Sequence, residues 1–183
     1  IAFTFNNSGS SFYLNGVYQT STAFSFTTNT TPVSGSLRLG GHVMTSASTR
    51  PFAGFIDDFR IYNRALSATE IAALATNVGM GSIPATTSFA TQLTFDKTTA
   101  DAQAGLPAPT VTGSAVYTPV CKTGTAALDL TGNTAASFPA TNCLTYTLAS
   151  GSYNVPISLS GWFNVVSATA SNNQVVMGIG NNS

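Results

Sequence analysis

The chain has 183 residues, of which 43% are hydrophobic, enough to bury the core of one ordinary domain. Only 7% of the residues are charged and the formal net charge is zero, so nothing in the composition would neutralise a phosphate backbone, and nucleic acid is not an expected partner. No apolar run approaches the roughly 20 residues that a membrane-spanning helix needs.

The first part of the chain predicts antiparallel strands. Short runs of Val, Ile, Phe, Tyr and Thr are separated by Gly, Asn and Ser at intervals of about ten residues, which is typical of an all-β sandwich or barrel. The run IAFTF alternates with period two. In FYLNGVYQ, Asn15 and Gly16 lie between two apolar-aromatic runs and tolerate the positive φ of a type I′ hairpin turn. SLRLGG and FAGFIDDFRIY predict two further strands.

A short helix and a linker are expected next. Ser67 and Glu70 form a capping box ahead of IAALA, which predicts a helix of about two turns. From Val78 to Gln92 the sequence VGMGSIPATTSFATQ loses its periodicity and collects Gly, Pro, Ser and Thr, as linkers do. Further strands are expected at 90–95, 116–118, 126–130, 136–138, 158–166 and 174–179.

The cysteines and the sequons favour an extracellular protein, either secreted or on a cell or virion surface. Cys121 and Cys143 flank strand-like stretches that could lie side by side, so we predict a disulfide, with two buried free thiols as the alternative. Asn6, Asn29 and Asn181 each begin an Asn-x-Ser/Thr sequon and are candidate glycosylation sites.

Several segments resemble the laminin G-like, concanavalin A-like jelly-roll family, but in inverted order. The stretch FAGFIDDFRIYNRALSATEIAAL, from Phe52 to Leu74, resembles the closing segment of that family. LTFD, GTAALDLTG and SGWFNV, which resemble earlier family segments, come only afterwards, at 93–96, 124–132 and 160–165. The resemblance implies an antiparallel jelly-roll β-sandwich with one short helix.

The inverted order leaves two domain organisations open. Residues 1–77 are the C-terminal half of a sandwich, residues 78–92 a linker, and residues 93–183 an N-terminal half. The second half belongs either to the next repeat or to the same, circularly permuted domain. Strands that the family places between its G-x-G and I-A-F-T-F strands have no counterpart, so an open edge is expected, which a neighbouring copy could complete by strand addition.

The family shares its fold with glycoside hydrolases, but the residues predict no enzyme. A retaining glycosidase needs two carboxylates about 5 Å apart, and no E-x-D-x-x-E pattern occurs. Asp57 and Asp58 are adjacent in a predicted strand, so their side chains are expected on opposite faces. His42 is the single histidine and no G-x-S-x-G motif accompanies it.

Calcium is the cofactor that the resemblance implies. Alternation predicts that Asp57 faces inward together with Phe59 and Ile61. A buried carboxylate needs partners, and Asp57 is a candidate Ca²⁺ ligand together with Asp96 or Asp101.

The alternative to a metal site is that both neighbouring carboxylates have protein partners. Asp57 would then accept backbone N–H bonds, and Asp58 would pair with Arg60 or Arg64.

Two functions remain. Trp162 lies in the SGWF strand, where packing is expected, and exposed stacking on sugars is left to Tyr13, Tyr18, Tyr146 and Tyr153. One hypothesis is a structural or adhesion module that assembles with other copies or adjacent repeats into a filament, fibre or coat. The alternative is a calcium-dependent, lectin-like module of a large secreted or virion-surface protein that binds glycans or surface proteins.

Overall fold

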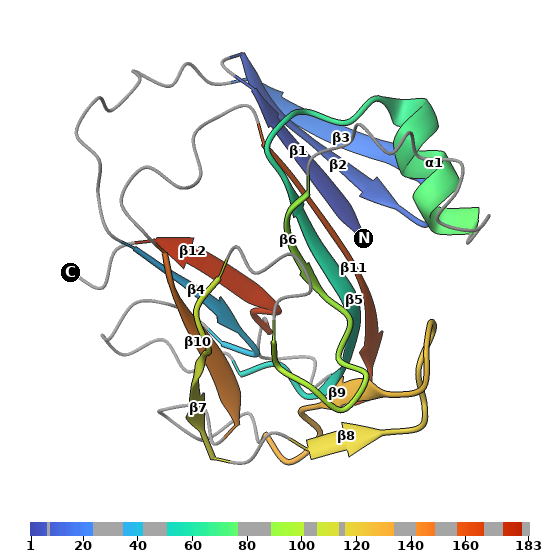
Figure 1. Ribbon diagram of the computed structural model, residues 1–183. Helices are drawn as coiled ribbons and strands as arrows, with labels where there is room; N and C mark the ends of the chain where they lie inside the picture. Colours follow the sequence, from blue (N-terminus) through green and yellow to red (C-terminus); the bar gives the residue numbers. More distant parts are fainter. Residues whose placement is uncertain are drawn as a thin grey trace.

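A computed structural model of the chain describes residues 1–6, 8–23, 35–41, 51–76, 89–100, 106–113, 116–133, 142–148, 157–166 and 174–180. Two antiparallel sheets pack face to face (Figure 1), which confirms the predicted β-sandwich. The larger sheet has eight strands in the order β3-β2-β1-β11-β5-β9-β8, with β6 also paired to β5, and the smaller has four in the order β12-β4-β10-β7.

The strands of the larger sheet are β1 (Ala2–Asn6), β2 (Gly9–Leu14), β3 (Val17–Ala23), β5 (Gly54–Tyr62), β6 (Phe89–Leu93), β8 (Val116–Thr118), β9 (Ala127–Asp129) and β11 (Ile157–Val165). The strands of the smaller sheet are β4 (Gly35–Leu39), β7 (Thr110–Thr112), β10 (Cys143–Leu148) and β12 (Met177–Gly180). The helix α1 (Ala68–Thr76) lies beside β2 and β3 (Figure 1).

Local sequence signals predicted many of these elements correctly. The hairpin turn between β2 and β3 has φ values of 50° at Asn15 and 80° at Gly16, as a type I′ turn requires. The predicted linker, by contrast, is too long, because its last four residues belong to β6, while its residues 78–88 lie outside the described ranges. The strand expected at 136–138 also lies outside them, and the sequence analysis missed both β7 and β10.

The two parts of the chain contribute strands to the same sheets. β5 pairs with β11 along one edge and with β6 and β9 along the other, and β1 pairs with β11. In the smaller sheet, β4 lies between β10 and β12. Three strands before α1, namely β1, β4 and β5, therefore have hydrogen-bonded neighbours that come from after it.

Apolar residues cover both faces of the larger sheet. Between the sheets, a buried cluster includes Phe52, Phe59 and Tyr146. On the opposite face, a smaller cluster packs Tyr62 of β5 against Ile71 of α1. The helix therefore covers part of the outer face and leaves the inner face to the smaller sheet.

A β-bulge in β5 corrects the predicted orientation of Asp57. Arg60 pairs with Ser160 and Asp57 pairs with Trp162, so Asp58 and Phe59 together oppose the single residue Gly161. Asp58 has a positive φ of 46° at this bulge. The inner cluster contains Ile56, Phe59 and Ile61, a spacing that simple alternation does not produce. Asp57 therefore lies on the opposite face from Ile56 and does not share the inward face of Phe59 and Ile61.

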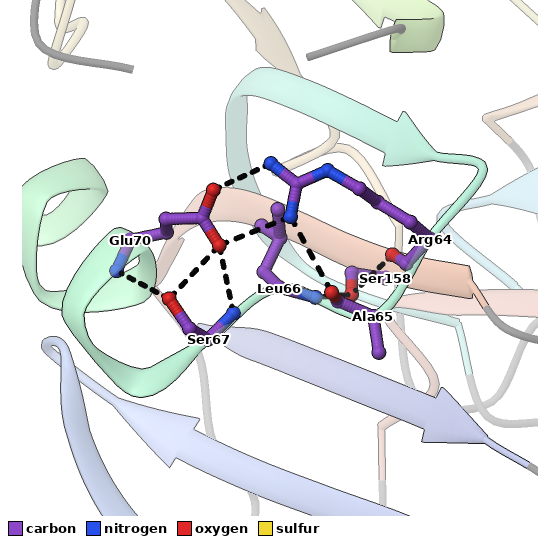
Figure 2. A network of polar contacts seen from close by, with 6 residues as sticks. All are labelled: Arg64, Ala65, Leu66, Ser67, Glu70 and Ser158. Carbon is purple, nitrogen blue, oxygen red and sulfur yellow. Dashed lines mark hydrogen bonds and ion pairs between the residues drawn. The ribbon is translucent and has the colours of Figure 1, made fainter. Parts of the chain in front are cut away.

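Hydrogen bonds fix the start of α1 to the larger sheet (Figure 2). Ser67 and Glu70 form the predicted capping box, because the Ser67 N–H donates to Glu70 Oε2 at 2.9 Å and the Glu70 N–H donates to Ser67 Oγ at 3.3 Å. Arg64 forms a bidentate ion pair with Glu70. Ser158 of β11 donates to the Arg64 carbonyl and accepts from the Leu66 N–H, which ties the segment before α1 to β11.

This network predicts part of the acid sensitivity of the fold. Hydrogen bonding from Arg64 lowers the pKa of Glu70 to about 2. Because this pKa is lower in the folded chain than in the unfolded chain, the stabilisation is present in full above about pH 4.5 and is lost as the pH falls towards about 2. The Glu70→Gln variant is expected to lose less stability than the wild type over this range in urea unfolding at several pH values. Parallel stability curves for the two proteins would contradict this role of Glu70.

Candidate functional site

Two of the residues that the sequence analysis proposed as metal ligands, Asp57 and Asp96, meet at one loop, residues 121–126, between β8 and β9. Asp57 comes from β5, next to the bulge, and Asp96 follows β6. Asp57 Oδ2 accepts the N–H of Lys122 at 2.7 Å and that of Thr123 at 2.8 Å. Asp96 Oδ1 accepts the N–H groups of Thr125 and Ala126. Two carboxylates from different strands therefore hold neighbouring backbone groups of one loop, which we call the carboxylate-bound loop.

Glycine at position 124 makes this arrangement possible. A Cβ atom on Gly124 would lie 2.3 Å from Oδ1 and 2.4 Å from Oδ2 of Asp96, far inside van der Waals contact. Its φ of 64° also favours glycine. The sequence analysis used Gly124 as part of a family motif and did not recognise that it makes room for the carboxylate of Asp96.

The two carboxylates differ in their electrostatic environment. Burial raises the pKa of Asp57, which is only 3% exposed, although the N–H groups of Thr123 and Lys122 oppose this effect. The N–H of Thr125 instead holds the pKa of Asp96 below its ordinary value. The charged form of Asp96 is therefore favoured by its hydrogen bonds, whereas the charged form of Asp57 is disfavoured by burial.

One oxygen of Asp57 differs from the other in its contacts. Its Oδ1 is buried and accepts no hydrogen bond from any described residue. Calcium takes about six to eight oxygen ligands, so an ion at this loop would need backbone carbonyl oxygens or further side chains besides Asp57 and Asp96. The described residues include no group of three or more His, Cys, Asp or Glu side chains that could hold a metal, and Asp101 lies outside them.

Asp58 has the ion-pair partner that was weighed as the alternative to a metal. Arg60 Nε donates to Oδ1 at 2.8 Å and Arg60 Nη2 donates to Oδ2 at 2.6 Å. Both residues are buried, at 7% exposure for Asp58 and 6% for Arg60. The two adjacent carboxylates therefore have different partners. Asp57 accepts backbone N–H groups of the carboxylate-bound loop, and Asp58 forms an ion pair with Arg60.

Trp162 lies beside this site and is half-buried. It is the cross-strand neighbour of Asp57, and the Lys122 ammonium lies 4.5 Å from the centroid of its ring. Trp162, Asp58 and Asn15 line a crevice of about 30 Å³ next to α1. A water needs about 10–15 Å³ measured in this way, so the crevice is too small for a sugar ring. These contacts agree with the predicted packing role of Trp162.

Other proposed site residues have different environments. Tyr13 and Tyr146 are buried, so neither is available for stacking on a sugar, whereas Tyr18 is 52% exposed. Tyr153 and His42 lie outside the described residues. Asn6 is exposed and its side chain accepts the N–H of Ser8 at 2.8 Å, while the sequons at Asn29 and Asn181 lie outside the described residues.

The predicted disulfide is absent, and both cysteines are free thiols. Cys121 follows β8 of the larger sheet, whereas Cys143 begins β10 of the smaller sheet. The prediction assumed that the flanking strands are neighbours, and the structure places them in different layers. Cys143 is buried against its own sheet, where it pairs with Thr112.

Comparison with known families supports the resemblance for the first part of the chain. Residues 1–72 match the family model described as the concanavalin A-like lectin/glucanases superfamily. Over these residues the chain is similar to that superfamily. The match covers β1 to β5 and the first turns of α1, and so includes Asp57 and Asp58. Searches among curated protein sequences and solved structures gave no match to the chain.

The family match supports the general assignment of a lectin-like or adhesion module. Its description names both lectins and glucanases, so the match alone does not decide between binding and hydrolysis. Asp96, the carboxylate-bound loop and Trp162 lie beyond the matched residues. In the part of the chain that the structure describes, no helix has the length and hydropathy needed to cross a membrane.

Proposed function

We propose that the chain is a non-catalytic extracellular structural or adhesion module that assembles with neighbouring copies into a filament, fibre or surface coat. The observation that carries this proposal is the unequal size of the two sheets, with eight strands facing four among the described residues. Part of the inner face of the larger sheet therefore extends past β12, the end strand of the smaller sheet. Strand edges beside apolar surface favour the addition of further strands.

The charge and the carboxylate contacts support the same proposal. With 7% charged residues and no net charge, copies of the chain do not repel one another strongly. Five of the described carboxylates have protein partners: Asp57, Asp58, Glu70, Asp96 and Asp129. Carboxylates engaged in this way are poor candidates for the acid and the nucleophile of a glycosidase.

Sedimentation velocity over a wide concentration range, followed by electron microscopy of the concentrated sample, tests this proposal. We expect association that increases with protein concentration and depends only weakly on salt, because few charges are available to be screened. A monomer at every concentration would refute the assembly proposal.

A second candidate function is a calcium-dependent module that binds glycans or surface proteins. The unpartnered Oδ1 of Asp57 favours it, and Asp57 and Asp96 would hold the ion, with Asp101 a further candidate. Calcium would then neutralise the buried carboxylate and fix the carboxylate-bound loop as a recognition surface.

Thermal unfolding with calcium, with magnesium and with a chelator tests the metal site. Calcium is expected to raise the midpoint for the wild type, because an ion that binds only the folded chain stabilises it, and to have little effect on Asp57→Asn. Magnesium serves as the control for nonspecific ionic effects. Unchanged midpoints for the wild type, together with no heat of calcium binding in calorimetry, would exclude this candidate.

A further inference from the structure

An apolar groove of about 660 Å³ lies between the two sheets, next to the end of the smaller one. Its floor is the inner face of β1, β2 and β11, and its wall is the segment that leads into β12. Aromatic and aliphatic side chains dominate the lining, among them Phe3, Phe5, Phe12, Phe163 and Met177. None of these side chains is charged.

The aromatic rings of the floor form one continuous surface. Phe3 of β1 is the cross-strand partner of Phe12 of β2, and their ring centroids are 4.8 Å apart. The rings of Phe3 and Phe5 stack at 6.3 Å. All three side chains are only partly buried, although they lie on the face that packs against the smaller sheet elsewhere. A further apolar layer over this surface would bury them.

A strand edge runs beside this aromatic floor. β12 pairs with β4 from Met177 to Gly180 and is the last strand of the smaller sheet among the described residues. A new strand beside β12 would therefore find backbone hydrogen-bonding groups on one side and the phenylalanine rings beneath it. An edge and an apolar floor together are the two requirements for strand addition.

The shape of the sandwich limits what can enter the groove. Antiparallel pairing of β12 with the β12 of another copy requires a two-fold axis normal to the sheet, which places both larger sheets on the same side. The strands β1 and β2 line the groove beyond β12 in each copy, so the two larger sheets would occupy the same space. A single extended segment, with no second sheet behind it, avoids this clash.

We propose that the groove accepts an extended segment of a neighbouring copy as an additional strand beside β12. Apolar side chains at alternate positions of this segment would contact Phe3, Phe5 and Phe12, and the uncharged lining selects an uncharged segment such as this composition supplies. The donor and acceptor surfaces differ, so the contact is heterologous and propagates from copy to copy. This inference rests on the proposed assembly and identifies its contact.

Cysteine labelling tests where the contact lies. The Phe12→Cys variant places a thiol in the groove, and Val116→Cys places a control thiol on β8, where Val116 is 48% exposed and far from the groove lining. Alkylation is followed by mass spectrometry of each labelled peptide, because Cys121 and Cys143 are also free. We expect the thiol at position 12 to react quickly in dilute protein and severalfold more slowly under conditions of assembly. The thiol at position 116 should react equally fast under both conditions.

The other outcomes are distinct. Assembly that leaves the thiol at position 12 reactive would overturn the groove as the contact while leaving the proposed assembly intact. Slow labelling even in dilute protein would show that the same chain covers the groove, and would also overturn the inference. Absence of assembly in the wild type would remove the proposed function and this inference together. A Phe12→Asp variant that keeps the wild-type circular dichroism spectrum and still assembles would count against the groove as well.

Discussion

Replacing Arg60 with methionine is expected to lower the free energy of unfolding by about 3–5 kcal/mol, because the substitution leaves a buried carboxylate without its counter-ion. Asp58 and Arg60 form a bidentate pair in which both side chains are less than 10% exposed, at 9% and 7%. Methionine keeps most of the apolar contacts of the arginine stem, so the decrease in the free energy of unfolding is due mainly to the lost charge. Urea unfolding monitored by tryptophan fluorescence measures the difference.

Arg64→Met is the matched control, because the Arg64–Glu70 pair has similar geometry but partly exposed side chains, at 36% and 23%. Surface pairs contribute only about 0–1 kcal/mol, so this control should lose much less stability. The double variant Asp58→Asn/Arg60→Met should recover part of the loss, because asparagine tolerates the positive φ at the bulge and carries no charge. Equal losses for Arg60→Met and Arg64→Met would contradict the importance of burial.

Asp57→Ala is expected to destabilise the fold by about 2–4 kcal/mol, because two backbone N–H groups lose a shared acceptor and each unsatisfied group costs about 1–3 kcal/mol. The affected groups are the N–H of Lys122 and the N–H of Thr123. Faster hydrogen exchange at these two amides, measured by NMR, would localise the effect to the carboxylate-bound loop.

Asp57→Asn separates hydrogen bonding from charge. The asparagine carbonyl can accept the same two N–H groups, and the substitution removes a desolvated carboxylate whose pKa is raised by burial. This variant should therefore lose much less stability than Asp57→Ala. If both variants destabilise equally, the charge of Asp57 is essential and the backbone contacts are secondary.

Elements specified by neighbouring residues could be predicted from the sequence. The hairpin at Asn15 and Gly16 follows from the conformational freedom of these two residues, and the start of α1 follows from the side chains of Ser67 and Glu70. These signals act over a few residues, so no knowledge of the tertiary structure is needed to recognise them. β10 carried a comparable signal, since Leu144, Tyr146 and Leu148 alternate and are buried, but it was overlooked.

Features that depend on distant neighbours could not be predicted in the same way. The orientation of Asp57 depends on a bulge, in which Gly161 of β11 lies opposite two residues of β5. The sequence around Asp57 and Asp58 gives no sign of the extra residue, so regular alternation placed Asp57 on the wrong face. The cysteine pairing failed for a related reason, because spacing along the chain does not reveal which sheet a strand joins.

The candidate site was predicted only in part. Asp57 and Asp96 were named as acting together, and the structure does bring both to one loop. Their partners are main-chain N–H groups, at residues 122 and 123 for Asp57 and at residues 125 and 126 for Asp96, which no side-chain pattern identifies. Gly124 carried a partial signal, because a glycine in a loop often permits the close approach of another group.

The mixing of early and late strands in the larger sheet constrains how the chain folds during synthesis. β1 finds a hydrogen-bonded neighbour in β11, with Ala2 opposite Ser160, so this edge of β1 is completed only after nearly the whole described sequence has left the ribosome. Contacts between such distant residues slow folding, since a large loop must close before they form. Until then the phenylalanines of β1 and β2 lack these late strands as neighbours, in a nascent chain with few charges, and such exposed apolar segments favour aggregation.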